Sequence, residues 1–215
     1  MNFKKAIVRH FYNTEEDYEN KFNELTKDIN LNEIVSYATR EKRDNEINGR
    51  EHWFISKEEA KNKLSQNNIL AYTKIGDIEY FTTNDQLNES NVYKINPDAI
   101  NDMKLDKDII SKIIYISVPD DIRLERAKSR SDYDKEFEKR NSAEDKQFTE
   151  FEKNGKIDKS ILNIDLEESI FVFIKFIIET YRKNPNRKIL FIIVGRTASG
   201  KDTILIKAKE ILNKK

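Results

Sequence analysis

The sequence predicts an α/β fold with a central parallel β-sheet, and its apolar runs and helical patterns are the evidence. Parallel strands covered on both faces have almost unbroken runs of branched and aromatic apolar residues. Four segments show this pattern: Glu33–Ala38, Val92–Asn96, Ile113–Val118 and Ile189–Val194. Helical periodicity follows two of them, and alternating strands and helices indicate a parallel sheet.

Two helices are well defined by their apolar spacing. The first spans Asp165–Arg182 and stops before the Asn184-Pro185 step, because the residue before proline is biased away from helix. The second spans Lys201–Leu212 and has Leu205, Ala208 and Leu212 on one face.

The remaining segments are assigned from weaker patterns. Lys5–Phe11 is predicted to be a strand, followed by a helix that Thr14 and Asp17 begin with a capping box. The stripe Tyr18, Phe22, Leu25 and Ile29 marks the buried face of this helix. Residues 40–84 and 119–160 are expected to be insertions over a sheet edge, because turn residues and dense charge interrupt the pattern.

Composition limits the possible functions. The 215 residues include 39 Lys and Arg, 39 Asp and Glu, and no Cys, so a disulfide scaffold, a cysteine zinc site and a thiol nucleophile are excluded. A net charge of zero argues against a nucleic-acid surface along the whole chain. No apolar run is long enough for a bilayer, and no signal-peptide pattern opens the chain, so we expect a single cytoplasmic domain without a membrane partner.

The strongest functional signal is a glycine-flanked loop between the last strand and the last helix. Its G-x-x-x-x-G-K pattern predicts a phosphate-binding loop, whose inward N–H groups and following helix N-terminus bind nucleotide phosphates. Lys201 would neutralise charge during phosphoryl transfer, and a glycine-rich turn that binds nothing is the alternative. The expected ATP ligands are Gly195, Arg196, Thr197, Ala198, Ser199, Gly200, Lys201, Asp202 and Thr203.

Asp202 stands where such loops usually have a magnesium-binding Ser or Thr. A carboxylate can bind this hard cation directly or through water, so Asp202 is the predicted Mg²⁺ ligand. Its negative charge requires the metal or arginines to offset it. The aspartate also resembles the loop of phage-type deoxynucleoside monophosphate kinases.

A second motif points to a particular kinase family. Ser36-Tyr37-Ala38-Thr39-Arg40, Arg43, Glu46, Asn48-Gly49 and Phe54 resemble the guanylate kinase signature S-x-x-T-R-x-x-R-x-x-E-x-N-G. Tyr80, Thr82, Pro119-Asp120, Leu162-Asn163 and Asp165-Leu166 resemble further motifs of that family. The resemblance covers residues 31–212 as several short motifs.

This resemblance implies a three-layer phosphate-loop kinase fold with a nucleoside monophosphate (NMP)-binding insertion and a lid. It divides the chain into an extension (1–30), an NMP-binding region (31–90), a lid (119–160) and a core (161–215) that ends with the phosphate loop. Guanylate kinases have this loop first, so the order here resembles a circular permutation. Permutation is tolerated where termini lie close together on the surface.

The resemblance also assigns roles. The NMP ligands would be Ser36, Arg40, Arg43, His52, Tyr80, Thr82 and Asn96; the catalytic residues would be Lys201, Arg126, Arg130 and Arg140; and Asn163 would lie near the ATP base. Arginine pairs can hold a phosphate with forked donors and a lid can exclude water, which agrees with these roles. The alternative is that these arginines belong to a solvated charged surface without a ligand.

Two positions depart from the family pattern at the expected monophosphate site. His52 replaces a phosphate-contacting Tyr, and Ala71 replaces the glutamate that reads guanine. Asn96 can accept one hydrogen bond, but Ala71 can accept none, so either Glu79 or Asp77 supplies the acceptor or base discrimination is weakened.

The sequence thus predicts an ATP-dependent kinase of GMP or dGMP that uses ATP and Mg²⁺ and has small-molecule nucleotides as its partners. The alternatives are a broader deoxynucleoside monophosphate kinase, a regulatory NTPase or small-metabolite kinase, and a non-catalytic guanylate-kinase-like binding module. Intact Gly195, Gly200 and Lys201 favour an enzyme over the binding module.

Overall fold

The computed structural model describes residues 1–44, 46–128 and 135–213. For residues 135–140 and 143 it describes the backbone but not the side chains. Within these ranges the chain forms two compact units. The first consists of the described residues within 1–31, 112–187 and 193–213, and the second of those within 32–111 and 188–192.

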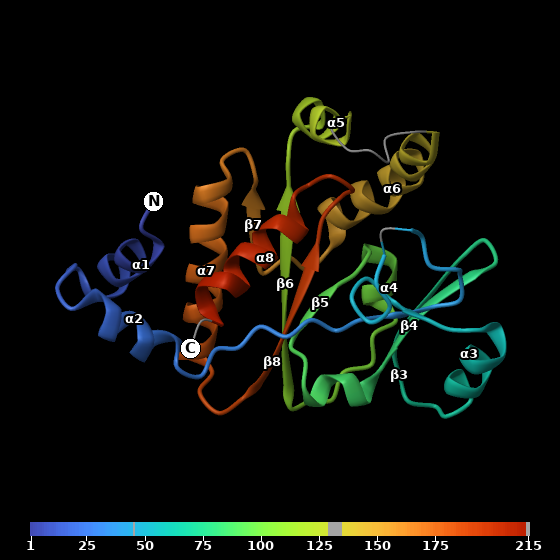
Figure 1. The fold of residues 1–215 in the computed structure, drawn as a ribbon, viewed down its shortest axis with the longest axis horizontal. Helices are drawn as coiled ribbons and strands as arrows, with labels where there is room; N and C mark the ends of the chain where they lie inside the picture. Colours follow the sequence, from blue (N-terminus) through green and yellow to red (C-terminus); the bar gives the residue numbers. More distant parts are fainter. Residues whose placement is uncertain (45, 129–134, 214–215) are drawn as a thin grey trace. The chain divides into compact units, whose positions relative to one another are not determined.

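Helices and strands are mixed along the whole chain (Figure 1). Up to residue 108 they are α1 (Phe3–Tyr12), α2 (Tyr18–Thr26), β1 (Tyr37–Ala38), β2 (Trp53–Phe54), α3 (Lys57–Leu64), β3 (Ile69–Ile75), β4 (Ile78–Thr83), the 3₁₀ helix η1 (Asn84–Asn88), β5 (Val92–Lys94) and α4 (Pro97–Asn101). They continue with β6 (Ile109–Ser117), α5 (Asp120–Lys128), α6 (Lys135–Asn154), β7 (Lys159–Leu162), α7 (Leu166–Lys183), β8 (Lys188–Val194) and α8 (Lys201–Leu212).

The described strands form two sheets, with the orders β5-β8-β6-β7 and β2-β1-β4-β3. In the first sheet β6 and β7 are parallel, with Ile116 opposite Ile161. The predicted α/β class with a parallel sheet is therefore confirmed. Residues Ile189–Val194 of β8 are all buried, as its unbroken apolar sequence predicts.

Helix α7 supplies much of the core of the first unit. Asp165 caps its N-terminus by accepting a hydrogen bond from the Glu168 N–H at 2.8 Å. Its apolar stripe is buried against α8 and β7, and burial of each large apolar side chain contributes about 1.5–3 kcal/mol. The buried apolar residues of the stripe are Ile170, Phe173, Ile174, Ile177 and Ile178.

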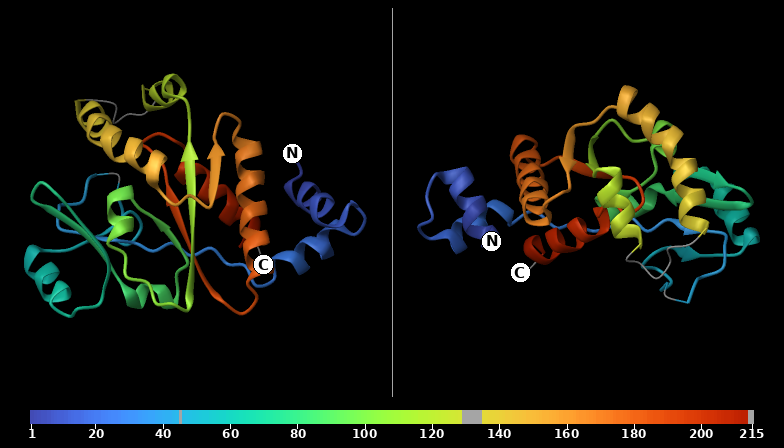
Figure 2. Two further views of the ribbon diagram at one scale, coloured as in Figure 1. Left: turned by 180° about the vertical axis from the view of Figure 1, so that it is seen from behind. Right: turned by 90° about the horizontal axis from the view of Figure 1, so that it is seen from above.

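The predicted strand at Lys5–Phe11 is wrong, because this segment lies in helix α1. Asn2 caps the helix by accepting a hydrogen bond from the Lys5 N–H at 3.2 Å. Ile7 and Val8 are fully buried, and α1 packs against α2 and α7 (Figure 2). The predicted capping box at Thr14 is also wrong, because Asp17 precedes α2 without a side-chain capping bond.

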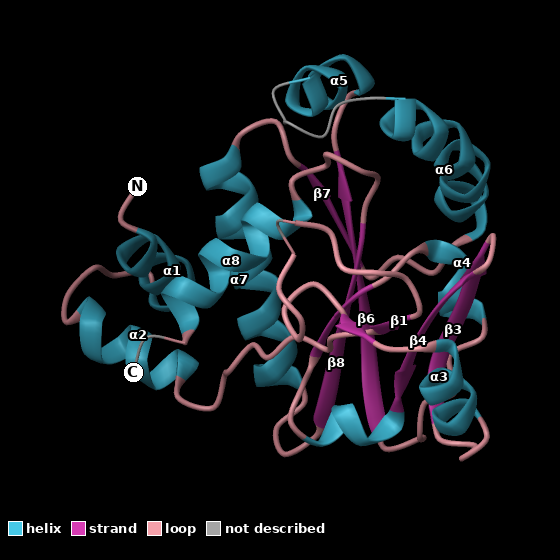
Figure 3. Cartoon of the chain, turned by 45° about the vertical axis from the view of Figure 1, so that its right-hand side comes forward, coloured by secondary structure: helices cyan, strands magenta, loops and turns pink. Residues whose placement is uncertain are grey.

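The predicted strand at Glu33–Ala38 is shorter than expected. Glu33 makes a single parallel bridge to Val92, and only Tyr37 and Ala38 form a strand, β1, which belongs to the other sheet. Strand β1 pairs in parallel with β2 and antiparallel with β4. The hairpin β3–β4 completes that sheet and turns at Gly76, where φ is +59° (Figure 3).

The end of α8 is tied to the segment that follows α2. Asn213 accepts a hydrogen bond from the Leu31 N–H at 3.0 Å through its side-chain oxygen. Its side-chain amide donates back to the Leu31 carbonyl at 3.2 Å. This reciprocal pair satisfies both backbone groups of a fully buried residue.

Candidate nucleotide-binding sites

The phosphate loop of the first unit has a backbone that only certain residues adopt easily. Ala198 has φ +64° and Gly200 has φ +84°, both in the left-handed region. A Cβ on Gly195 would lie 2.6 Å from the Ser199 hydroxyl oxygen and 2.7 Å from the Ile116 carbonyl oxygen. Both glycines of the motif are therefore required by the geometry, while Ala198 adopts a strained conformation.

The loop and the first turn of α8 line a cavity of about 520 Å³. Arg126, from α5, lines the same cavity, so a second cation lies at the predicted ATP site. The structure thus brings these predicted residues together: Arg126, Thr197, Ala198, Gly200, Lys201, Asp202 and Thr203. A cavity walled by Lys201, Arg126 and a helix N-terminus is suited to a polyanion.

Asp202 is exposed in the first turn of α8. Its carboxylate and the neighbouring Thr203 hydroxyl offer hard oxygen donors at the cavity wall, which are the donors that magnesium prefers. The donor chemistry therefore fits a cation held between Asp202 and bound phosphates. Its role as the metal ligand stays a prediction.

Asn163 holds the phosphate loop. It follows β7 and is buried, and its side-chain amide donates a hydrogen bond to the Ser199 carbonyl at 2.8 Å. Within the described chain, neither the Asn163 side-chain oxygen nor the buried Ser199 hydroxyl has a hydrogen-bond partner. The predicted contact of Asn163 with the ATP base stays a prediction.

Helix α6 makes the contacts with the loop that sequence analysis missed. Arg196 forms an ion pair with Asp145, lies 3.9 Å from a Glu152 carboxylate oxygen, and stacks 5.2 Å from the centre of the Phe148 ring. Burial alone would lower the pKa of Arg196, but Asp145 and Glu152 raise it above its ordinary value. Arg196 therefore stays charged and joins the loop to α6.

Thr197 is also bound by α6. Its N–H donates to one carboxylate oxygen of Glu144 at 2.9 Å, and its hydroxyl donates to the other at 2.6 Å. Nothing in the sequence distinguishes Glu144 from the many other charged residues of 119–160. Its contact with Thr197 joins residues 53 positions apart, which local patterns do not report.

Two of the predicted lid arginines lie where no side chain is described. Arg130 lies outside the described residues, and Arg140 lies in α6 where only the backbone is described. Arg126 is the predicted lid arginine whose side chain is described, and it donates to the Ile164 carbonyl at 3.5 Å.

The second unit carries a cluster centred on Arg40. Its guanidinium donates two hydrogen bonds to Glu46, each 2.6 Å long, and a third to the Tyr80 hydroxyl at 3.3 Å. It also lies 5.0 Å from the centre of the Phe54 ring. The hydrogen bond with Arg40 lowers the pKa of Glu46 to about 2, so the pair is ionised at neutral pH. This fixes the orientation of Arg40.

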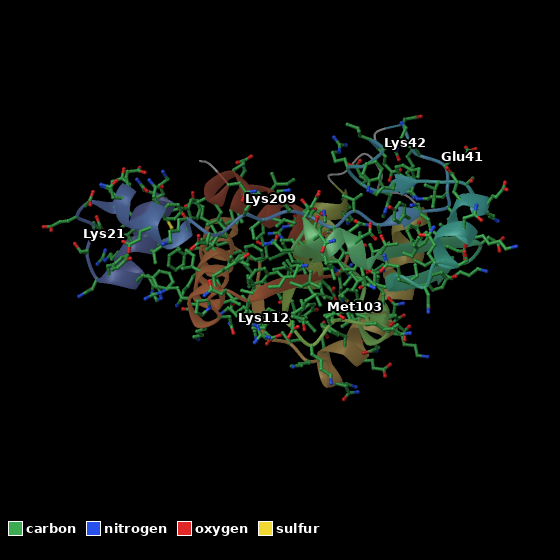
Figure 4. All side chains as sticks on the ribbon, turned by 90° about the horizontal axis from the view of Figure 1, so that it is seen from below. Lys21, Glu41, Lys42, Met103, Lys112 and Lys209 are labelled. Atoms are coloured by element: carbon green, nitrogen blue, oxygen red, sulfur yellow. The ribbon has the colours of Figure 1, made fainter. Side chains whose placement is uncertain are left out.

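Glu46 organises the rest of this loop as well, because it accepts the Arg43 N–H at 2.9 Å. Arg43 is exposed, and so are Glu41 and Lys42, which lie at the edge of the same loop (Figure 4). Arg40, Glu46 and the backbone N–H of Arg43 are therefore one hydrogen-bonded group.

His52 lies beside this cluster. Its Nδ1 atom is 2.8 Å from the Ser36 hydroxyl oxygen, and its ring packs edge-on to Phe54 and 5.4 Å from Tyr80. Burial lowers the pKa of His52 below its ordinary value of 6.5, and the charge of Arg40 lowers it further. The His52 imidazole is therefore neutral at physiological pH. A charged His52 that donates a charge-assisted hydrogen bond to a phosphate is not expected.

The β3–β4 hairpin presents the predicted base-reading positions on one face. Ala71 lies opposite Thr82 and Thr73 lies opposite Tyr80, and directly opposite residues share a face. Glu79 lies on the other face, where it accepts a hydrogen bond from the Tyr72 hydroxyl at 2.9 Å. The expectation that Glu79 supplies the missing guanine acceptor is therefore wrong in this conformation.

A tyrosine that sequence analysis did not single out lies at the same face. The Thr82 hydroxyl, which is fully buried, donates to the Tyr93 hydroxyl at 3.0 Å. Burial raises the pKa of Tyr93 to about 12, so the phenol stays protonated. Asn96 is exposed at the N-cap position of α4 without a side-chain capping bond.

Comparison with known proteins places the chain in a family. A family model described as guanylate kinase matches residues 22–180, which is more than half of the chain. The chain belongs to the guanylate kinase family. The match includes every predicted NMP ligand and Asn163, whereas the phosphate loop at 195–203 lies beyond its end. The circularly permuted order of this guanylate kinase family member stays a prediction.

Relatives named guanylate kinase agree with this assignment. The one from Wolbachia pipientis wMel is 28% identical over 154 residues, which are 68% of this chain and 75% of the relative. The one from Blochmanniella floridana is 40% identical over 63 residues, and the one from Chlamydia caviae is 31% identical over 98 residues. These matches cover 28% and 43% of this chain, and the chain spans 30% and 47% of the two relatives.

A solved structure supports the fold. The guanylate kinase from Anaplasma phagocytophilum superposes with a TM-score of 0.53 and 20% identity, over 76% of this chain and 80% of that one. Identity at this level supports the fold alone. Among the described residues, no helix combines the length and the apolar character needed to cross a bilayer.

Proposed function

We propose that this chain is a guanylate kinase that transfers the γ-phosphate of ATP to GMP or dGMP. The observation that carries the proposal is the cavity of about 520 Å³ formed by the phosphate loop, Lys201 and Arg126. Membership of the guanylate kinase family and the names of its relatives support the choice of acceptor.

In this proposal the loop N–H groups and the α8 N-terminus bind the ATP phosphates. Lys201 and Arg126 neutralise negative charge on the transferring group, and Asp202 holds the magnesium ion that accompanies the nucleotide. When bound, magnesium supplies positive charge to the phosphate oxygens. Catalysis then consists of alignment and charge neutralisation, without a covalent intermediate.

The monophosphate would bind at the Arg40 cluster. Arg40 is held by Glu46 and Tyr80, so its guanidinium is oriented before the substrate arrives. Ser36 and Tyr80 supply hydroxyl groups, and neutral His52 supplies one ring N–H when its tautomer allows. Arg43, exposed on the same loop, adds a second cation for the substrate phosphate.

The test is an ADP-release assay with ATP and each ribo- and deoxyribonucleoside monophosphate in turn. We expect GMP or dGMP to give the highest kcat/KM. ADP release without any acceptor would instead indicate a regulatory NTPase. Absence of transfer to every monophosphate would contradict the proposal and favour a binding module.

A second candidate is a kinase with broader specificity for deoxynucleoside monophosphates, and Ala71 favours it. Ala71 offers no acceptor to guanine, and the Thr82 hydroxyl opposite it is already bonded to Tyr93. An unpaired guanine donor costs about 1–3 kcal/mol, or one to two decades of preference. In the same assay, a guanine preference above about four decades over dAMP, dCMP and dTMP would rule this candidate out.

A further inference from the structure

An acidic side chain of α6 lies on the phosphate loop in the position of an anionic ligand. Glu144 accepts the Thr197 N–H at 2.9 Å and the Thr197 hydroxyl at 2.6 Å, one with each carboxylate oxygen. Backbone N–H and hydroxyl groups of such loops are donors for nucleotide phosphates. A carboxylate, like a phosphate, presents anionic oxygens to paired donors.

We infer that Glu144 is an internal competitor of ATP, which occupies a phosphate subsite at Thr197 and must leave when the nucleotide binds. This inference rests on the proposed ATP site, and it adds a residue that opposes nucleotide binding. Thr197 also lines the cavity of about 520 Å³, so the residue that Glu144 binds belongs to the predicted site.

The contacts around Arg196 support this inference because they hold α6 against the loop. Arg196 pairs with Asp145 and approaches Glu152 while its guanidinium stacks on Phe148. These residues lie within three turns of Glu144 on the same helix, so they fix the part of α6 from which Glu144 reaches the loop. Nucleotide binding must then either withdraw Glu144 alone or move α6 with it.

Charge gives a second reason why the contact opposes ATP. Asp145 and Glu152 place two carboxylates beside one cation, Arg196, and Glu144 adds a third carboxylate on the neighbouring Thr197. At Thr197 a triphosphate would meet this carboxylate charge, which opposes the attraction of Lys201 and Arg126, unless these groups move away. Removing the Glu144 charge should therefore favour the nucleotide both by freeing the Thr197 donors and by reducing repulsion.

The experiment measures the dissociation constants of ATP and inorganic tripolyphosphate by isothermal titration calorimetry. It compares the parent with Glu144→Ala and Glu144→Gln. Glu150→Gln is the matched control, because Glu150 is exposed on the same helix and the change removes the same charge. We expect both Glu144 variants to bind both ligands about tenfold to a hundredfold more tightly, and the control to stay within about twofold of the parent.

Weaker or unchanged ATP and tripolyphosphate binding in Glu144→Ala would overturn the inference, because Glu144 would then only support the loop. Turnover of GMP with unchanged affinities would leave the proposed function standing and the inference refuted. Tighter tripolyphosphate binding in Glu144→Ala, with no transfer to any monophosphate, would support the inference and refute the proposed function. A melting curve of each variant shows that the proteins compared are folded.

Discussion

Replacing Ala198 by glycine is expected to stabilise the protein, although most alanine-to-glycine changes destabilise. Ala198 has φ +64° in the phosphate loop, and a left-handed conformation costs an L-residue about 1–2 kcal/mol. Glycine removes this cost but loses about 0.4–1 kcal/mol through the greater freedom of the unfolded chain. Because Ala198 is only half-buried, its lost methyl contacts subtract a few tenths of a kcal/mol more.

The balance is a stabilisation of roughly 0.5 kcal/mol, which corresponds to a rise in Tm of about 1–2 °C for a chain of this size. Differential scanning calorimetry of Ala198→Gly measures it. Ala6→Gly is the control, because Ala6 lies inside α1, where the same change is expected to cost about 1 kcal/mol. Equal losses of Tm in the two variants would show that Ala198 is unstrained.

Three further predictions concern the two sites. Lys201→Ala should abolish phosphoryl transfer while a thermal melt stays within a few degrees of the parent, and retained turnover would refute its role. Glu46→Gln should cost about 1–2 kcal/mol at pH 7. Because the folded pKa of Glu46 is about 2, below its ordinary 4.5, this advantage of the parent should shrink as the pH falls from 4.5 towards 2; a difference in Tm that is constant with pH would contradict it. Burial lowers the pKa of His52, so the parent should lose stability relative to His52→Phe as the pH falls below 6.5; parallel Tm profiles from pH 8 to 5.5 would show that His52 is not the cause.

The base-reading face restricts how specificity can be tested. Ala71 is buried opposite Thr82, whose hydroxyl is bonded to Tyr93. Restoring the family's glutamate by Ala71→Glu alone would therefore bury a carboxylate beside a protonated phenol. Kinetic comparison of monophosphates in the parent is the cleaner test of base preference.

Sequence patterns predicted best those features that depend on local chemistry. The strand, glycine-flanked loop and helix at residues 188–212 are found almost as expected, because an unbroken apolar run, two glycines and a helical stripe each act over a few residues. The contact between Arg40 and Glu46 is also local, since the two residues are six positions apart, but the role of Arg40 as a monophosphate ligand stays a prediction.

Features that depend on distant contacts were missed or wrong. Lys5–Phe11 contains adjacent Ile7 and Val8, which favour a strand, but burial against α2 and α7 gives a helix. Glu144 and Tyr93 carry no motif, and their roles arise only from pairing with Thr197 and Thr82. Such pairings are set by tertiary packing, which single-sequence periodicity does not report.

The two hydrogen bonds between Leu31 and Asn213 suggest how the order of the gene could be rearranged. Two chain positions 182 residues apart are in direct contact, so a short peptide joining them would span the distance. Consider a gene that begins near Lys188 and joins the end of α8 directly to Asn32, without residues 1–31. Its product would have the phosphate loop near the start of the chain. In the present chain, two hydrogen bonds of the Asn213 side chain hold together the positions that a peptide bond would join in that one.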